Sequence, residues 1–523
     1  MKAFADRSVA VKAFLLIVAA SCALLLALPG TTIVASYVND LFIFLDGAHR
    51  IASGQVPSRD FHTPLGPLSF YIPAIGYWWA GNMGGAMPFG MALATLSLSL
   101  PLAHVLGSRM RAVIAIPYGF FLLLVVATPM NLGESVTELS FGMFYNRIGW
   151  ASLGVLLTMY LQPLQPRSWQ SSSDAVCAAV LILVMLYTKI TYGIVAIAFV
   201  VFLLFDKRQR AWAAISLGLT LIACFAIEAF WHATWAYLED IRLTSQVSGP
   251  RHLADFTSAF LRNWIDYTLL GLFIALVLWR TRSLRDLIFF GFCCVSGLLI
   301  QIQNAQYWGI LTIHAGIAVA AEMVLRQEQM QSYQETKAFP VSIAAPALSA
   351  LIVLPALLQS LGALGFHAAL GIARSGEAFE LPRFESIRLI SPWLSDSRTM
   401  MHDYLESIEN GARILEGLEV KPGKISVLDF SNPFSAGLGL IPPRGDNAWL
   451  HWGRNLDATH FIPPEQLLAD VQVLMIPKWG INPAPLLKLY GPYLEEVFEP
   501  LTETESWTVY RRKEQEVADK VPL

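Results

Sequence analysis

Long apolar runs constrain this chain more than any other feature of its sequence. A helix needs about 20 apolar residues to cross a hydrocarbon core of roughly 30 Å, and most of the runs approach that length. The chain is 55% hydrophobic and 14% charged, whereas soluble domains carry about 25% charged residues. The sequence therefore predicts a polytopic α-helical membrane protein, surrounded by membrane lipids. The runs lie at residues 13–29, 64–80, 86–107, 112–129, 148–162, 175–188, 190–205, 211–231, 264–280, 286–303, 306–325 and 340–364.

Basic residues between the runs predict how the spans are oriented. Lys and Arg concentrate in cytoplasmic loops. Five loops of this kind occur. All five lie on the cytoplasmic side of the membrane only if one of the runs does not cross it. The basic residues lie at Arg109 and Arg111, at Arg167, at Lys207, Arg208 and Arg210, at Arg280, Arg282 and Arg285, and at Arg326.

The run at 64–80 is the best candidate for an element that does not cross. It contains three prolines and two glycines, and its end is rich in Tyr and Trp, as is typical of a membrane interface. We expect it to be re-entrant or half-spanning, which leaves about eleven spans. The alternative is that 175–205 forms a single long element, which would invert the loops between the two runs.

The predicted topology places the N-terminus in the cytoplasm and the C-terminus outside it. Lys2, Arg7 and Lys12 precede the first run, which therefore resembles an uncleaved signal-anchor. Three longer loops, at 30–85, 130–147 and 232–263, then face the outside. Polar residues thus gather on the extracytoplasmic face, which argues against direct use of cytosolic nucleotides. The net charge of −3 indicates no charged partner, and we expect no nucleic acid to bind.

The composition changes after the last run, which divides the chain into a multispan domain at 1–365 and a soluble domain at 366–523. Segments 424–430, 471–477 and 506–512 predict short strands, and 465–470 and 484–497 predict helices. We therefore expect a small extracytoplasmic α/β domain. It contains no Gly-rich phosphate loop and no hydrolase motif, which favours a passive, substrate-shaping or stabilising role.

The first outer loop concentrates charged residues next to the first span. Asn39 can cap a helix from Asp40 to Gly54, and Asp46 and Arg50 are spaced to form an ion pair along it. An extended, proline-bounded stretch with Arg59, Asp60 and His62 follows. Each of these has a plain structural interpretation: Asp40 as a helix cap, and the other acidic residues as partners in ion pairs. Their concentration at one membrane face favours a site.

This loop resembles that of the GT-C superfamily, multispan glycosyltransferases that use polyprenyl-phosphate-linked sugars. The similarity consists of an acidic residue after the first span, a short helix, and the sequence GQVPSRDF at 54–61. FYNRIGWASLG at 144–154 and YTKITYG at 187–193 fit the same pattern. The protein mannosyltransferases and the lipid A aminoarabinose transferases are the most similar groups. The chain departs from many relatives in having Asp40-Leu41 where they carry Asp-Glu.

The resemblance implies transfer of a sugar from a lipid phosphate to a glycan, lipid or protein acceptor at a bacterial inner membrane. Asp40 is the expected base, in a single displacement that inverts the anomeric centre. Cations would stabilise the leaving phosphate; Lys189 is one candidate, and a snorkelling lysine is its structural alternative. The other candidate substrate-binding residues are Asp46, Arg59, Asp60, His62, Arg147 and Arg251.

A divalent metal is a further hypothesis, because some relatives of this superfamily use one. Its ligands would come from Asp40, Glu134, Glu138 and His252, although these residues form no compact ligand motif. The third outer loop is long enough to close over a substrate, or it is a solvated connector. A secondary transporter or lipid flippase is an alternative class, and a non-catalytic envelope assembly subunit is another. The chain shows no internal repeat of the kind that transporters often contain.

Overall fold

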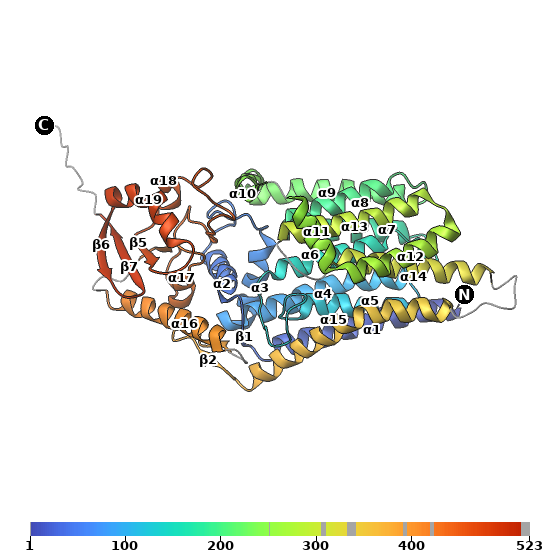
Figure 1. Ribbon diagram of the computed structural model, residues 1–523, viewed down its shortest axis with the longest axis horizontal. Coiled ribbons are helices and arrows are strands. Elements are labelled where there is room, and N and C mark those ends of the chain that lie inside the picture. The colour runs from blue at the N-terminus through green and yellow to red at the C-terminus, as the bar shows by residue number, and fades with distance from the viewer. Residues whose placement is uncertain are drawn as a thin grey trace.

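The apolar runs fold into helices that pack side by side in a bundle (Figure 1). Helices suit such a sequence because hydrocarbon offers the backbone no hydrogen-bond partners. The structure is a computed structural model that describes residues 2–249, 252–304, 310–331, 341–390, 395–418 and 423–513. The bundle contains α1 (Lys2–Ala27), α3 (Leu68–Ala80), α4 (Met83–Arg109), α5 (Ala112–Ala127), α6 (Phe144–Thr158), α7 (Gln170–Thr188), α8 (Ile190–Leu203), α9 (Arg210–Trp231), α12 (Trp264–Thr281), α13 (Leu284–Asn304), α14 (Leu311–Gln331) and α15 (Val341–Ile372).

Seven helices of the described residues are long and apolar enough to cross a membrane. They are α1, α4, α7, α9, α12, α13 and α15. Helices α5 and α8 are apolar but shorter, with 16 and 14 residues. A largely helical fold with several candidate spans therefore agrees with the sequence, whereas the expected total of about eleven stays a prediction.

The run at 64–80 forms α3, which has only 13 residues. At about 1.5 Å per residue such a helix extends roughly 20 Å, less than a span requires. It packs against α4 and ends at Gly81, whose φ of 72° suits glycine. The alternative of one long element over 175–205 is wrong, because the chain leaves the helical conformation at Lys189, where φ is −158° and ψ is 114°.

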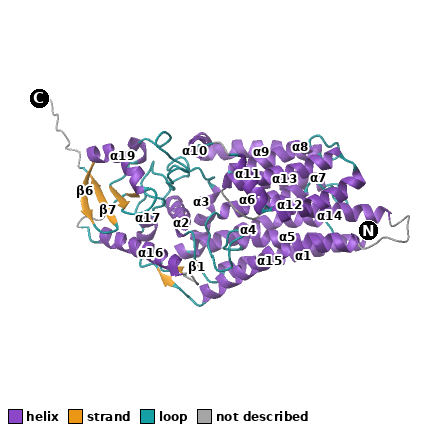
Figure 2. Cartoon of the chain, in the orientation of Figure 1, coloured by secondary structure: helices purple, strands orange, loops and turns teal. Residues whose placement is uncertain are grey.

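The C-terminal part contains a four-stranded sheet at the end of the molecule away from the N-terminus (Figure 2). All three predicted strands form, and a fourth, β6, pairs antiparallel with β7. The sheet order is β4-β5-β7-β6, with β4 and β5 parallel. The strands are β4 (Ile425–Val427), β5 (Val473–Pro477), β6 (Phe498–Glu503) and β7 (Trp507–Arg512), and the helices are α16 (Ser395–Glu416), α17 (Pro433–Leu438), α18 (Pro464–Leu467) and α19 (Pro483–Val497).

The first outer loop and the C-terminal part are joined by a second, three-stranded sheet. Strand β1 (Thr32–Val34) pairs in parallel with β3 (Ile387–Leu389), which also pairs with β2 (Glu377–Ala378). Helix α15 continues past the predicted domain boundary at 365 and ends at Ile372. The C-terminal part is therefore built onto the first loop, and its position at this end of the bundle depends on that loop.

Three further helices lie in the outer loops and complete this end of the molecule. Helix α2 (Val38–Ala52) follows β1, and α10 (Thr234–Ser248) and α11 (Leu253–Arg262) form the third loop. Figure 1 shows α2 and α10 between the bundle and the C-terminal sheet. The helix expected from Asp40 to Gly54 is thus present with slightly shifted ends, and Asn39 is not its cap. Tyr37, with a positive φ of 54°, holds the cap position instead.

Candidate active site

Asp40 lies in the first turn of α2, where the helix dipole favours a carboxylate. The second outer loop comes close to it. A Cβ on Gly142 would lie 3.0 Å from Oδ2 of Asp40 and 2.9 Å from Cβ of Tyr37, so only glycine permits this approach. The side chain of Asp40 keeps part of its surface accessible. Asp40 is therefore a largely desolvated carboxylate in a residue that keeps part of its surface accessible.

Burial raises the pKa of Asp40 to about 6, and the positive charge of Arg454 partly opposes this rise. Desolvation disfavours the charged form of any carboxylate, so this direction is expected for a largely buried one. Arg454 comes from the C-terminal part, where its guanidinium carbon lies 5.5 Å from the centroid of a Trp449 ring. A carboxyl group with this pKa is ionised at neutral pH and is a stronger base than an ordinary aspartate.

Lys189 lies between α7 and α8, at the break in the helical conformation. Its ammonium donates hydrogen bonds to the side-chain oxygens of Asn146, at 3.3 Å, and Asn304. The nitrogen also lies 5.2 Å from the ring centroid of Tyr145. Among the described carboxylates, none forms an ion pair with Lys189 or with Arg454. Two cations without an acidic partner are a chemical feature that an anionic ligand would complete.

These groups are linked by the contact of Lys189 with the Tyr145 ring and by the effects of their charges on one another's pKa. The charge of Arg454 acts on Asp40, on Tyr145 and on Lys189, and the charge of Asp40 acts on the hydroxyl group of Tyr145. We call Asp40, Tyr145, Lys189 and Arg454 the Asp40 cluster. It combines a carboxyl group of raised pKa, two basic side chains and an aromatic hydroxyl group, contributed by α2, α6, the α7–α8 break and the C-terminal part.

Arg59, Asp60 and His62 lie in a different place from the Asp40 cluster. Arg59 donates to Oδ2 of Asp60 at 3.2 Å, and the other carboxylate oxygen accepts from Arg444 at 2.7 Å. His62 contacts α10 instead. These three residues line one pocket between the first loop, α10 and the C-terminal part. The structure therefore brings together three of the predicted residues around this pocket, away from Asp40.

Asp46 is completely buried, and the predicted ion pair with Arg50 is present at 2.6 Å. Arg50 also donates to Oδ2 of Asp446 at 2.9 Å and to the carbonyl of Pro443 at 2.8 Å. Asp46 therefore pairs with Arg50 within α2, and Arg50 holds α2 against the C-terminal part. Arg147 is buried in α6 and donates to the carbonyl of Met130 at 3.2 Å. Arg251 lies outside the described residues.

The four residues considered as metal ligands do not form one group in the described structure, because Asp40, Glu134 and Glu138 all act on the hydroxyl group of Tyr37 whereas His252 belongs to the start of α11. Glu134 accepts a hydrogen bond from the hydroxyl of Tyr37 at 3.0 Å, and Glu138 lies near the same hydroxyl group. His252 instead caps α11. No group of three His, Cys, Asp or Glu residues that could hold a metal ion occurs in the described part of the chain. These residues do not fit a metal site, and a metal stays a hypothesis from the sequence.

Sequence reasoning missed Arg454, Tyr145, Asn146 and Asn304. Arg454 belongs to a domain that the sequence indicated to be passive, and no local pattern connects it with Asp40. The sequence could have pointed to Tyr145 and Asn146, because they lie in the segment 144–154 that resembles the superfamily. All four residues are brought into the site by contacts between parts of the chain that are far apart in the sequence.

Comparison with known proteins adds little to this description. No family model matches the sequence, and no match is found among curated proteins. The solved structures that resemble the fold include the crystal structure of ArnT from Cupriavidus metallidurans in the apo state. The two share 10% sequence identity with a TM-score of 0.45, over 94% of this chain and 97% of that chain. These values do not establish a family, so the residues of the site have to support the functional conclusion.

Proposed function

We propose that this protein is a membrane glycosyltransferase that transfers a sugar from a polyprenyl-phosphate donor to an extracytoplasmic glycan, lipid or protein. The observation that carries the proposal is the Asp40 cluster, in which a partly accessible carboxylate of raised pKa lies near Arg454, whose charge also acts on Lys189. We place the protein in a bacterial inner membrane as a multi-pass protein, with the C-terminal domain in the periplasm.

The proposed reaction is a single displacement. The carboxylate of Asp40 takes the proton of the acceptor hydroxyl group, and the acceptor oxygen forms a bond to the anomeric carbon. The bond between that carbon and the phosphate oxygen breaks, and the electron pair leaves with the polyprenyl phosphate. The leaving group gains negative charge in this step, and Lys189 and Arg454 stabilise that charge. The anomeric configuration is inverted because the bonds form and break on opposite faces.

An apolar groove beside Lys189 supports a lipid-linked donor. It has a volume of about 400 Å³ and is lined by Tyr187 and Ile190, the close neighbours of Lys189, and by residues of α9 and α10. Phe225 and Trp235 of this groove are 69% and 78% exposed. It therefore opens on the outside of the bundle, where a polyprenyl chain would lie in the lipid. A chain held there would have its phosphate near Lys189.

The direct test uses the full chain in nanodiscs with radiolabelled polyprenyl-phosphate sugars. Release of polyprenyl phosphate that depends on the protein and on an envelope extract would support the proposal. Analysis of envelope glycans in a deletion strain should reveal the missing sugar. Unchanged envelope glycans, together with no specific donor binding, would contradict the proposal and favour an assembly subunit.

The pH dependence of transfer should follow the ionisation of Asp40. Because the carboxylate is the base, kcat should rise with pH and reach half of its maximum near pH 6. Replacing Arg454 by Gln removes a charge that lowers this pKa, so the midpoint should move to higher pH. Replacing the exposed Arg413 by Gln is the matched control. An unchanged midpoint in the Arg454 variant would show that this charge does not act on the base.

Filling the apolar groove should weaken donor binding. Cys224 lines the groove on α9, and Trp at this position would occupy space that the lipid chain needs. We expect Cys224→Trp to raise the KM for the donor about 10-fold with little change in kcat, the pattern of lost ground-state binding. Gly218→Trp on the same helix is the control, since no atom lies within 4 Å of a Cβ built there. Equal KM values for the two variants would argue against the groove as the lipid site.

A further inference from the structure

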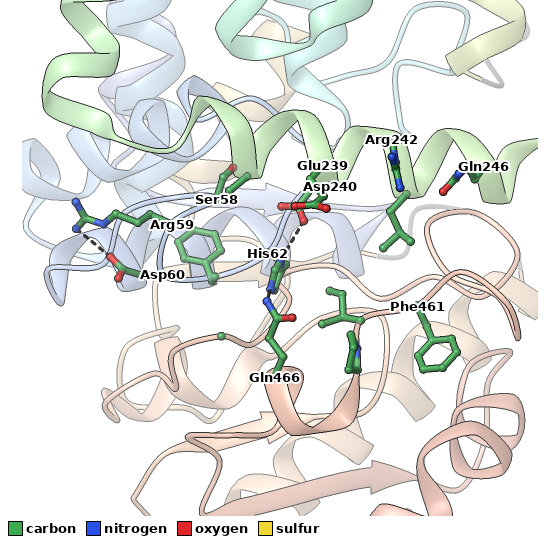
Figure 3. Close-up of a pocket in the computed structure, with 16 residues that line it drawn as sticks. Ser58, Arg59, Asp60, His62, Glu239, Asp240, Arg242, Gln246, Phe461 and Gln466 are labelled. Carbon is green, nitrogen blue, oxygen red and sulfur yellow. Dashed lines mark hydrogen bonds and ion pairs between the residues drawn. The ribbon is translucent and has the colours of Figure 1, made fainter.

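A pocket separate from the Asp40 cluster lies between the first loop, α10 and the C-terminal part. It has a volume of about 410 Å³, within the roughly 300–1,000 Å³ of most small-molecule sites. Figure 3 shows Arg242 and Gln246 on α10 across from Phe461 and Gln466 of the C-terminal part. Three parts of the chain that are distant in sequence thus form its walls.

A chain of hydrogen bonds through His62 holds these walls together. Nδ1 of His62 lies 2.9 Å from a carboxylate oxygen of Asp240, and Nε2 lies 2.9 Å from the amide nitrogen of Gln466. The amide donates, so Nε2 accepts and Nδ1 carries the proton that is donated to Asp240. The other oxygen of Asp240 accepts from the backbone N–H of Thr63 at 2.9 Å. The pocket is therefore a built cavity whose shape is set without a ligand.

Several polar groups in the pocket have no partner among the residues that the structure describes. Glu239, Arg242 and Gln246 lie on one face of α10, because they are spaced by three and four residues. Among the described residues, none forms a hydrogen bond or ion pair with the side chains of Glu239 and Arg242. Arg59 and Arg242 of the lining, together with Arg444, which pairs with Asp60, carry three positive charges. Asp60, Glu239 and Asp240 carry three negative charges, so the charges on and beside the pocket balance. The pocket therefore offers many donors and acceptors and almost no net charge.

We propose that this pocket binds an uncharged sugar unit of the acceptor glycan. A sugar ring has hydroxyl groups that match paired carboxylate, guanidinium and amide groups, and an apolar face that packs on an aromatic ring. Glu239 and Arg242 supply the first feature, and Phe461 supplies the second. A neutral polar ligand suits a pocket whose charges balance. The acceptor role rests on the proposed glycosyltransferase function, whereas sugar binding itself does not.

The position of the pocket suits an acceptor. Its lining includes Gly445, Phe461 and Gln466, and the segment that connects them carries Arg454 to the Asp40 cluster. Helix α10 also runs from the pocket toward Arg454, because Oγ of Ser248 near the end of this helix donates to the carbonyl of Arg454 at 3.4 Å. A glycan seated against α10 can therefore extend from the pocket toward Asp40.

Saturation-transfer NMR on the full chain in nanodiscs tests the binding directly. The probes are the methyl α-glycosides of glucose, mannose and galactose. At least one should give a signal with the native protein and with the Asp40→Asn variant. Arg242→Gln and Phe461→Ala should reduce that signal about 10-fold, as expected for the loss of an important contact. The matched controls are Arg413→Gln and Phe205→Ala, because Phe205 is 85% exposed on the bundle.

The variants also distinguish this proposal from the proposed function. In a transfer assay, Arg242→Gln and Phe461→Ala should raise the KM for the acceptor with little change in kcat or in the thermal unfolding midpoint. No signal with any probe, or equal signals in the native and Phe461→Ala proteins, would overturn the sugar pocket. Active transfer with an unchanged acceptor KM in both variants would overturn its acceptor role and leave the transferase intact. Specific sugar signals without any transfer would support the pocket while counting against the transferase.

Discussion

Replacing Asp40 by Asn should lower kcat for sugar transfer by about 10³-fold, within the range of roughly 10²–10⁴ that a general base contributes. Asn has nearly the same shape but cannot accept the proton of the acceptor hydroxyl group. The proposed donor contacts come from Lys189, Arg454 and the apolar groove and not from Asp40, so the KM for the donor should change little. Transfer of label from a polyprenyl-phosphate sugar in nanodiscs measures both quantities.

The same variant should fold at least as well as the native protein. Burial places the pKa of Asp40 at about 6 in the folded state, above the value of about 3.9 in an unfolded chain. The folded state therefore binds the proton more tightly, and ionised Asp40 costs stability as the pH rises through this interval. Asn removes that cost at neutral pH. Asp403→Asn, at an exposed position on α16, is the control. Full activity of Asp40→Asn would disprove the role of Asp40 as the base.

Replacing Arg50 by Met should destabilise the end of the molecule that carries the C-terminal part, by about 3–5 kcal/mol. Arg50 is completely buried, and its guanidinium group connects Asp46 of α2 with Asp446 and the carbonyl of Pro443. Its carbon also lies 5.2 Å from the ring centroid of Phe61. Burial already raises the pKa of both carboxyl groups, and Arg50 opposes that rise. Met would leave two buried carboxylates without a counter-ion.

Thermal unfolding and limited proteolysis measure this effect. We expect a lower unfolding midpoint and faster cleavage within residues 373–513. Arg413→Met, at an exposed position on α16, should change neither. The triple variant with Leu at positions 46 and 446 and Met at 50 should recover much of the loss, because it removes the unpaired charges as well. Wild-type stability of Arg50→Met alone would show that this network does not hold the C-terminal part in place.

Local sequence patterns predicted helices and strands well where the apolar residues recurred with a single period. The strands at 424–430, 471–477 and 506–512 and the helix at 484–497 are all present, because alternation and turn residues are local signals. The helix after the first span is present, but its cap differs. Asn39 is a good capping residue by type, yet the chain enters the helix through Tyr37 in the left-handed conformation. Close approach of the second loop, permitted by Gly142, lies outside any local signal.

The candidate site was only partly predictable for the same reason. Asp40 was identified by its position directly after the first span and by the resemblance of the first loop, and Lys189 because a charged residue at membrane depth is costly. Arg59, Asp60 and His62 were grouped with Asp40 because they are close in sequence. In the structure they face α10 and the segment around Gln466, across a pocket of their own. Nearness along the chain is a poor guide to which cavity a loop residue enters.

The sequence by itself determined the class of the protein, because apolar runs of this length and number have to bury their backbone polar groups as helices in a membrane. It also located the polar residues that such a chain retains at one end. Only the tertiary structure decided which of these residues form the Asp40 cluster and which of them line the pocket beside α10. Arg50 ties α2 to the C-terminal part, and Arg454 thereby comes near Asp40 and Lys189. Charges act through space over a few ångströms, so residues separated by some 400 positions can form one site once buried contacts fix the domains.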